Sequence, residues 1–254
     1  MSLSGDIIKI DNGMVLKSRY STSIDRWNAN INKQLFWQSP YVNAVNIISK
    51  GDGYVSMPYI NNADVFTAFC VLNTIQIHTI KDKLIGHIED CIQHSVLKPF
   101  NVNAWQSKLI ELKSKINDPC IDKLLSIDTS LPLYEGKCHG DFSMSNLLFK
   151  HADIYAIDFL STFYESPLQD IVKLRQDTAY HFINKQQDNY KLKPLLSFKI
   201  IDAALQHIID NDPYLSHYYK YFMMLNFLRI LPYAQNDKII KYIEHVIYLL
   251  GENL

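Results

Sequence analysis

The residues with the clearest chemical potential lie in one short stretch near the middle of the chain. His139, Asp141 and Asn146 follow the pattern His-Gly-Asp-x-x-x-x-Asn, and Asp158 comes twelve residues after Asn146, between two apolar residues. A single aspartate at a strand-to-loop junction is usually a turn or cap residue, because its side chain bonds to the nearby backbone. Four fixed residues in one octet and a second acid at the end of the next hairpin are a more specific signal, typical of a catalytic site.

This pattern resembles the aminoglycoside phosphotransferase and choline kinase family, whose members are distant relatives of the protein kinases. The resemblance implies that Asp141 accepts or orients the proton of a substrate hydroxyl, while Asn146 and Asp158 hold Mg²⁺. These residue types suit the chemistry, because transfer of a γ-phosphoryl group needs a carboxylate beside the attacking hydroxyl and oxygen ligands for the metal ions that neutralise the triphosphate. His139 is expected to support this loop through a hydrogen bond rather than to act as an acid.

A helix is expected to start soon after Asp158. Ser166, with Pro167 at the first helical position and Gln169 three residues after the cap, follows the pattern of a capping box. In the resembling family a Gly-Asp-Pro-x-x-Asp-Leu segment follows the metal-binding aspartate, and its last acid braces the catalytic loop. The corresponding residue here is Asp170, although the glycine is missing, so we expect Asp170 to support the loop.

One position of the octet differs from the protein kinases. Ser143 stands where they carry a lysine. A neutral side chain there removes one cation from the surroundings of the γ-phosphate, so we expect a metal ion or Lys17 to supply more of the charge stabilisation.

The nucleotide side of the site is predicted on an early strand. The segment Val15-Leu16-Lys17 looks like the Val-Ala-Ile-Lys strand of kinases. Alternation along a strand puts Val15 and Lys17 on one face, so Val15 is expected to cover the adenine of ATP and Lys17 to reach its α and β phosphates. A lysine on a strand is more often a solvated edge residue, and Lys9 and Arg19 are rival candidates for the same role.

Two features of this nucleotide site depart from the family. In most relatives an acid on the next helix holds the lysine, but residues 27–37 contain no Asp or Glu. The residues that would have to replace this acid are Asp25, Asn28, Asn30 or Asn32. The phosphate loop is short and has no Gly-x-Gly-x-x-Gly, so we expect backbone N–H groups at Ser4 and Gly5 to bind the phosphates.

The connector at residues 54–60 lies where the resemblance places the hinge that binds adenine through its backbone, which implicates Met57 and Tyr59. A plain strand end stopped by Pro58 predicts the same sequence. The connector is also expected to separate two lobes. These are an N-terminal nucleotide-binding lobe at residues 1–60 and a C-terminal helical lobe, with the catalytic loop and the substrate site, at residues 61–254.

The elements that must position these residues change in kind along the chain. Asn-Gly at residues 12–13, between apolar runs, predicts a hairpin because it supplies the positive φ of a tight turn. A second hairpin is predicted with its turn at residues 49–53. Between the two, Trp27, Ile31 and Leu35 recur at helical spacing and predict one helix packed on this sheet.

After the connector the pattern is mostly helical. Apolar residues recur every three or four positions in several segments, and Asp212-Pro213 predicts the start of an aromatic-rich helix. Three short apolar segments, 131–138, 146–150 and 154–159, predict strands with the candidate residues in the loops at their ends. We therefore predict an α+β, bilobal protein-kinase-like fold, with a small N-terminal β-sheet lobe that contains one helix and a larger, mostly helical C-terminal lobe.

The composition excludes several classes of function. The 254 residues include 25 Lys plus Arg and 26 Asp plus Glu, a net charge of −1, which is too little to draw the protein onto nucleic acid or an anionic membrane. The 4 cysteines form no Cys-x-x-Cys pair, and neither a signal peptide nor a membrane-spanning segment is recognisable. We therefore expect reduced thiols and a cytoplasmic protein, while the sequence leaves the oligomeric state open.

The function predicted from these features is ATP- and Mg²⁺-dependent transfer of the γ-phosphoryl group to a hydroxyl of a small molecule. A sugar, an amino alcohol such as choline and an aminoglycoside all remain candidates. Aromatic rings that could surround a quaternary ammonium, although rings at such spacing are usually core, are Tyr218, Tyr219, Tyr221 and Phe222. The alternative is a nucleotide- or ligand-binding pseudokinase without turnover. A protein-substrate kinase fits less well, because no Asp-Phe-Gly or Ala-Pro-Glu segment is present.

Overall fold

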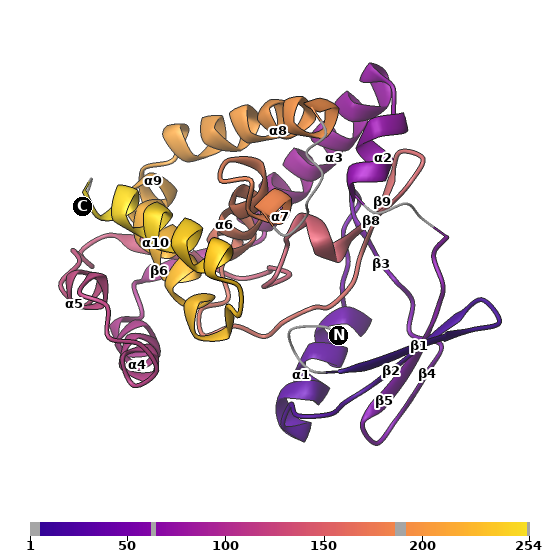
Figure 1. Cartoon of the computed structure of the whole chain (residues 1–254), viewed down its shortest axis with the longest axis horizontal. Helices are drawn as coiled ribbons and strands as arrows, with labels where there is room; N and C mark the ends of the chain where they lie inside the picture. Colours follow the sequence, from indigo (N-terminus) through magenta and orange to yellow (C-terminus); the bar gives the residue numbers. More distant parts are fainter. Residues whose placement is uncertain (1–5, 62–64, 186–191, 253–254) are drawn as a thin grey trace.

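The computed structural model describes residues 6–61, 65–185 and 192–252. Figure 1 shows a small β-sheet at the lower right with helix α1 next to it, and a larger group of helices on the other side. The strands are β1 (Ile7–Asp11), β2 (Met14–Ser18), β3 (Asn43–Ala44), β4 (Ser49–Gly51), β5 (Tyr54–Pro58), β6 (Val96–Pro99), β7 (Pro132–Glu135), β8 (Leu147–Lys150) and β9 (Asp153–Ala156). The α-helices are α1 (Ile24–Leu35), α2 (Val65–Val71), α3 (Thr74–Gln93), α4 (Val102–Lys113), α5 (Cys120–Leu125), α6 (Pro167–Thr178), α7 (Phe182–Lys185), α8 (Leu192–Asn211), α9 (Pro213–Leu228) and α10 (Asp237–Gly251). Short 3-10 helices occur at Met144–Asn146 (η1) and Leu231–Tyr233 (η2).

The N-terminal sheet is built from two hairpins, in the order β1-β2-β5-β4. β1 pairs with β2 around Asn12 and Gly13, whose φ angles are 47° and 74°. This confirms the hairpin predicted from Asn-Gly, since both turn residues need positive φ. The second hairpin is also present, but β4 begins at Ser49, inside the predicted turn, and the chain reverses at Asp52 and Gly53.

α1 packs its apolar face on this sheet, as predicted. Trp27 and Ile31 are buried in a cluster with two residues of β5. Leu35, predicted on the same face, is 41% exposed because it is the last residue of the helix. Gln34 is buried instead, and its Nε2 donates to a backbone oxygen at 2.7 Å. The last buried side chain on this face of the helix is therefore a polar one whose amide group is hydrogen-bonded.

The three strands predicted in the C-terminal part are present in shorter form as β7, β8 and β9. β8 and β9 form a hairpin, and β9 also pairs in parallel with β3. β6, which the sequence did not indicate, pairs with β7. The β3–β9 ladder therefore ties the segment between α1 and β4 to the hairpin that precedes Asp158.

α6 begins at the predicted position, with Ser166 as N-cap and Pro167 in the first turn. The Oγ of Ser166 accepts from Leu168 N at 3.3 Å, whereas the N–H of Gln169 donates to the Ser166 carbonyl oxygen. The cap is thus confirmed, but the predicted capping box with Gln169 is wrong. Within α6 every residue except Lys173 is buried.

The aromatic helix is α9, and it begins as predicted, because the side chain of Asp212 accepts from two N–H groups of its first turn. Tyr218, Tyr219 and Phe222 are 0%, 8% and 2% exposed. These three rings are therefore mainly core residues of the helical part, whereas Tyr221 is half-buried.

The predicted fold class, α+β with a small N-terminal sheet and a larger helical part, is confirmed. The buried apolar side chains form one large cluster in the helical part and a smaller one between α1 and the N-terminal sheet. The lobe boundary at residue 60 stays a prediction. Among the described residues, no helix combines the length and the apolar character needed to cross a membrane.

Candidate active site

The His-Gly-Asp octet, called the catalytic loop below (residues 139–146), is closed by the short helix η1. Asn146 Nδ2 donates both to the backbone oxygen and to Oδ2 of Asp141, each at 2.9 Å. The amide nitrogen of Asn146 therefore faces Asp141, and its Oδ1 is the side-chain atom left to meet a cation. The two loop residues that the sequence singled out are brought together.

Asp158 lies beside the catalytic loop, at the end of the β8–β9 hairpin. The N–H of Ile157 donates to the backbone oxygen of Asn146 at 3.1 Å, which fixes this segment against the loop. Asp158 has a φ of 60°, in the left-handed region that non-glycine residues adopt rarely. Backbone strain of this kind is concentrated at functional sites.

Lys17 joins this group from the N-terminal sheet. Its Nζ lies 2.9 Å from Oδ1 of Asp158 and 3.3 Å from Oδ2 of Asp6. Burial lowers the pKa of Lys17, but the two carboxylates outweigh burial and raise the pKa above its usual value, so Lys17 stays charged. Asp6, which the sequence did not indicate, supplies the acid that the following helix lacks.

The other candidates for these roles lie elsewhere. Arg19 Nη1 donates to the backbone oxygen of Thr22 at 2.7 Å, and Lys9 is exposed on the edge strand β1. Asn30 Oδ1 accepts from Ser161 N at 2.8 Å, so this residue of α1 contacts the segment after Asp158. The expectation that a residue between positions 25 and 32 replaces the missing acid is corrected, because Lys17 is held by acids before β1 and after β9.

α1 is tied to the C-terminal part by Lys33. The Nζ of Lys33 lies 2.5 Å from Glu165 Oε2 and donates to the backbone oxygen of Leu160 at 2.9 Å. A cavity of about 1680 Å³ lies at this contact and is lined by Lys33, Cys138 and Glu165 among others. The predicted catalytic and metal-binding residues do not line this cavity, so it is separate from the site where we expect the reaction.

Apolar side chains accompany Lys17 on one face of the sheet. The β1–β2 register pairs Ile8 with Lys17 and Ile10 with Val15, and directly paired residues share a face. Ile8 and Ile10 are 48% and 61% exposed. Val15 packs against the cluster that also receives apolar residues of β8 and of the segment after β9. The sequence indicated Val15 but missed the two isoleucines, although the alternation along β1 is a usable signal.

The predicted hinge residues contribute differently. Met57 is 6% exposed, so its side chain belongs to the core of the sheet. The N–H of Tyr59 donates to the backbone oxygen of Gly13 at 2.8 Å, which leaves the Tyr59 carbonyl oxygen as the backbone group available to a base. Ser4 and Gly5 lie outside the described residues.

Asp170 holds the start of the catalytic loop, in the geometry expected of it. Its Oδ2 accepts from His139 N at 2.5 Å and its Oδ1 from Gly140 N at 2.7 Å. Burial raises the pKa of Asp170 to about 7, although the two N–H donors act in the opposite direction. Gly140 has a φ of 89°, and a Cβ there would lie 2.0 Å from the backbone oxygen of Leu160. Only glycine fits this position.

His139 links the catalytic loop to the segment of Asp158. Its Nε2 donates to Ile157 O at 2.9 Å, and its Nδ1 accepts from Asp141 N at 3.2 Å. One ring nitrogen donates and the other accepts, which is the pattern of a neutral imidazole. Burial lowers the pKa of His139 to about 4. The ring is therefore neutral at physiological pH, in keeping with a supporting role.

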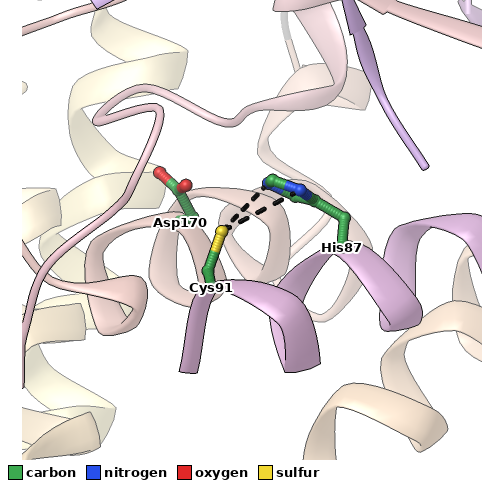
Figure 2. A group of neighbouring side chains, drawn as sticks. All are labelled: His87, Cys91 and Asp170. Atoms are coloured by element: carbon green, nitrogen blue, oxygen red, sulfur yellow. Dashed lines mark hydrogen bonds between the residues drawn. The ribbon is translucent and has the colours of Figure 1, made fainter. Parts of the chain in front are cut away.

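His87 and Cys91 lie next to Asp170, one turn apart on α3 (Figure 2). Their possible ligand atoms lie within 4.8 Å of one another, and a histidine, a thiol and a carboxylate this close together can hold a metal ion. Burial, however, raises the pKa of the Cys91 thiol, and both oxygens of Asp170 accept loop N–H groups. Figure 2 shows the Asp170 carboxylate turned away from His87. Asp170 is therefore engaged by the loop, and the ring of His87 packs against Phe142 of the loop with centroids 4.8 Å apart, so we do not assign these residues as a metal centre.

Three polar residues of α6, called the α6 polar face below, point toward the catalytic loop. They are Asp170, Lys173 and Asp177, spaced three and four residues apart and hence on one side of the helix. Asp177 accepts from Met144 N at 2.8 Å and from Ile183 N at 3.1 Å, and burial raises its pKa to about 7. The sequence pattern did not indicate Lys173 and Asp177, which reach the catalytic loop through the packing of α6.

Asp141 is paired with Lys173, whose Nζ lies 3.0 Å from Oδ1. Burial raises the pKa of Asp141, but Lys173 and the amide of Asn146 outweigh burial and hold the pKa below its usual value. Asp141 is therefore ionised near neutral pH, with a cation on one oxygen and an amide on the other. A carboxylate in this state can accept a hydrogen bond from an incoming hydroxyl.

Solved structures with a similar fold span almost the whole chain. The GDP complex of wild-type aminoglycoside 2'-phosphotransferase-IIIa is 12% identical, with a TM-score of 0.62 over 98% of this chain and 89% of that chain. Glucosamine kinase in complex with glucosamine, ADP and inorganic phosphate is 12% identical, with a TM-score of 0.55 over 98% and 81%. A choline/ethanolamine kinase family protein from Mesorhizobium loti is 12% identical, with a TM-score of 0.52 over 97% and 84%. At such low identity the likeness shows a shared fold.

Comparison of the amino-acid sequence alone assigns the family. No curated protein sequence matches the chain. The model of the ecdysteroid kinase-like family matches residues 56–186, just over half of the chain, and this segment contains the catalytic loop, Asp158 and α6. The predicted resemblance to small-molecule kinases is confirmed, and with it the kinase-like enzyme class. The chain belongs to the ecdysteroid kinase-like family.

Proposed function

We propose that the protein transfers the γ-phosphoryl group of ATP to a hydroxyl group of a small molecule, with Mg²⁺. The observation that carries this proposal is the linked arrangement of Asp141, Asn146, Asp158 and Lys17. Asn146 bonds Asp141 and, through its backbone oxygen, the segment of Asp158, while Lys17 bonds Asp158. A base, two oxygen donors and a cation are thus assembled from three separate segments, as phosphoryl transfer requires.

In this proposal Asp141 orients the acceptor hydroxyl and takes its proton. Asp141 is ionised because its pKa is held below the usual value, so it is a modest base that positions the hydroxyl well. The Asp158 carboxylate and Asn146 Oδ1 are hard oxygen donors of the kind that Mg²⁺ prefers, and we assign them as its ligands. Mg²⁺ supplies positive charge that neutralises the triphosphate.

The nucleotide would lie along the Lys17 face of the N-terminal sheet. Lys17 bears a charge suited to the α and β phosphates, and the exposed Ile8 and Ile10, with Val15, offer an apolar cover for a base. The Tyr59 carbonyl oxygen would accept from the amino group of adenine. We keep Ser4 and Gly5 as proposed phosphate contacts. Solved relatives were obtained as complexes with GDP and, in one case, with streptomycin and ATP, so both nucleotides belong in the assay.

The acceptor is proposed to be a hydroxyl compound without several positive charges. Lys173 sits on Asp141, and Arg229 stacks on Phe163 with its guanidinium carbon 5.9 Å from the ring centre. Burial lowers the pKa of Arg229, and the negative charge of Asp141 acts in the opposite direction; the guanidinium group is still charged at neutral pH. A neutral sugar or another uncharged alcohol suits these surroundings better than a polycation.

We also propose a cytoplasmic location, because ATP is available there and the four cysteines, all free in the structure, would stay reduced. The division into a nucleotide-binding lobe at residues 1–60 and a lobe with the catalytic loop at residues 61–254 is part of the same proposal.

A pseudokinase is the second candidate, because Lys17 forms an ion pair with Asp158, and this pair would have to break before Lys17 could bind a nucleotide. The two candidates differ in what Mg²⁺ does. Thermal shift with ATP or GTP, with and without Mg²⁺, measures nucleotide binding, and a bound nucleotide raises the melting temperature. Stabilisation that needs Mg²⁺ supports the enzyme, whereas stabilisation that ignores Mg²⁺ favours the pseudokinase.

The decisive experiment is a panel of hydroxyl compounds scored by release of ADP or GDP. Neutral sugars, amino alcohols and aminoglycosides form its three arms, with Asp141→Asn as the inactive control. Acceptor-dependent release above that of Asp141→Asn supports the proposal. Binding of nucleotide without release in any arm contradicts it.

A further inference from the structure

The catalytic loop lacks positive charge where protein kinases carry a lysine. Ser143 occupies this position, is 5% exposed, and bonds the hydroxyl of Ser145 at 2.9 Å. A serine side chain is uncharged, and the Ser143 hydroxyl is already hydrogen-bonded to Ser145, so this residue cannot supply positive charge to a γ-phosphoryl group. A cation does reach the reacting carboxylate, but from a different element.

Lys173 of α6 brings this cation to Asp141. The Nζ–Oδ1 distance is 3.0 Å, and the two side chains are 15% and 31% exposed. All other residues of α6 are buried. Lys173 therefore extends from a buried helix to a carboxylate that solvent and substrate can reach.

The ammonium group of Lys173 has donor capacity beyond this pair. A lysine carries three N–H donors, and within the described part of the chain the contacts of Nζ are with Asp141 and, at 3.4 Å, with Gln176 Oε1. The acids on either side of it have other partners, since Asp170 and Asp177 each accept two backbone N–H groups. Lys173 is thus placed for the reacting groups rather than for its neighbours on α6.

Lys17 does not duplicate this position. Its Nζ contacts Asp158 and Asp6, whereas that of Lys173 contacts Asp141. The carboxylate that meets the acceptor and the carboxylate that meets the metal each have their own lysine. Two cations so divided match the two ends of a reacting phosphoryl group, the attacking side and the leaving side.

We propose that Lys173 contacts the γ-phosphoryl group during its transfer and supplies the charge that the loop lacks at Ser143; this inference rests on the proposed function. The acceptor oxygen bonds to the γ-phosphorus while the bond from phosphorus to the β,γ-bridging oxygen breaks. The hydroxyl proton passes to Asp141, and the electron pair of the broken bond stays on the diphosphate. Lys173, held by Asp141, donates to a non-bridging oxygen of the group in transit.

The first test compares Lys173→Met and Lys173→Gln with the wild type under steady-state conditions. We expect kcat to fall about 100-fold in both variants, because one preorganised donor to the transition state is lost. The KM for ATP should change less than about threefold, since uniform binding is not affected. Lys199→Met, which removes an exposed cation of α8, is the matched control and should keep the wild-type kcat. A kcat within twofold of the wild type in either folded variant overturns the proposal.

The second test does not need an acceptor or a variant that folds. The wild-type protein is crystallised with ADP, Mg²⁺ and aluminium fluoride, a mimic of the phosphoryl group in transit. Lys173 Nζ is expected within hydrogen-bonding distance of a fluoride, about 3 Å, and a Lys173 that points away from the fluoride overturns the proposal.

Calorimetry separates this inference from the proposed function. Lys173→Gln should bind ADP as the wild type does but lose at least about tenfold in affinity for ADP with aluminium fluoride. This result with no turnover on any acceptor would reject the enzyme and keep the Lys173 contact. Equal affinity of both proteins for the mimic, with turnover present, would reject Lys173 alone. A wild-type protein that binds neither ADP nor ADP with aluminium fluoride would reject both the proposed function and the Lys173 contact.

Discussion

Lys17 and Asp158 form an ion pair of 2.9 Å between residues that are 141 positions apart in the sequence. The pair joins β2 to the segment after β9 and sits beside the carboxylate–amide pair of the catalytic loop. In the proposed reaction each partner exchanges the other for something stronger, Lys17 for phosphate oxygens and Asp158 for a divalent cation. The resting pair thus keeps two charged groups satisfied until substrate arrives.

Lys17→Met should weaken nucleotide binding. The variant loses the charge proposed to meet the α and β phosphates and leaves Asp6 and Asp158 without their cation. We expect the dissociation constant for ATP to rise about tenfold or more, measured by calorimetry with Mg²⁺. Lys9→Met, on the exposed strand β1, is the control. Equal effects of the two substitutions would show that Lys17 has no special role.

Asp141→Asn should remove turnover and leave the fold intact. The amide cannot take the hydroxyl proton, and a positioned base contributes roughly 10²–10⁴-fold to a rate. ADP release on the acceptor found in the panel measures the effect, and circular dichroism with a thermal melt checks the fold. Full activity in the folded variant would show that another group acts as the base.

Asp170→Ala should destabilise the protein. His139 N and Gly140 N would lose their shared acceptor inside the core, and each buried donor left unpaired costs about 1–3 kcal/mol. Relief of a buried carboxylate offsets part of this, so we expect a loss of about 2 kcal/mol in urea unfolding at neutral pH. Asp153→Ala, which removes an exposed ion pair with Lys83, should cost less than about 1 kcal/mol. The assignment fails if the two variants are equally stable.

Gly140→Ala and Gly13→Ala form a matched pair, because both glycines have positive φ. An added Cβ at Gly140 would collide with the Leu160 backbone oxygen at 2.0 Å, whereas at Gly13 it meets nothing within 4 Å. We expect Gly13→Ala to cost about 1 kcal/mol for φ alone. Gly140→Ala should cost clearly more and also lower activity, since the loop must move away from the segment after Asp158. Equal melting temperatures would contradict the tight contact.

His139 and His87 should stay neutral well below the ordinary pKa of histidine. Burial lowers their pKa values from 6.5 to about 4 and about 3. Their contribution to stability is therefore complete above pH 6.5 and is lost as the pH falls from 6.5 toward these values, because only the unfolded chain takes up the protons. Asp170 and Asp177 act in the opposite sense, since their pKa values are raised from 3.8 to about 7 and their contribution is lost as the pH rises through that interval.

Nitrogen-15 NMR of the histidine rings between pH 7.5 and 5 checks this directly. Both rings should keep the shifts of a neutral imidazole over this whole range. A titration of His139 near pH 6.5 would mean that the ring is not held as the structure has it.

Sequence spacing was sufficient to predict that Asp141, Asn146 and Asp158 lie close together, because local chain geometry brings them together. A short 3-10 turn closes the first pair, and the β8–β9 hairpin, whose strands have four residues each, returns the chain beside Asn146. Turn chemistry is equally local, so Asn-Gly predicted the first hairpin. Lys173 and Asp6 could not be found in this way, because each reaches its partner through the packing of separate elements.

The errors have physical causes of the same kind. The low β-propensity around Ser49 predicts a turn, but pairing with β5 makes this residue part of a strand. Leu35 was assigned to the buried face of α1 from its period, and the end of the helix leaves it exposed. The capping box at Ser166 was read from residue types, whereas the hydroxyl meets the N–H one position earlier.

The anchorage of α1 by Lys33 and Asn30 carries a mechanical consequence. Both side chains grip the stretch just after Asp158, at Leu160, Ser161 and Glu165. A rotation of α1 would therefore displace the segment that follows Asp158, the residue that we propose as a magnesium ligand. Substitutions in α1 that shift the helix should lower kcat more than they lower the melting temperature. A compound that binds α1 could therefore slow the reaction without competing with the nucleotide.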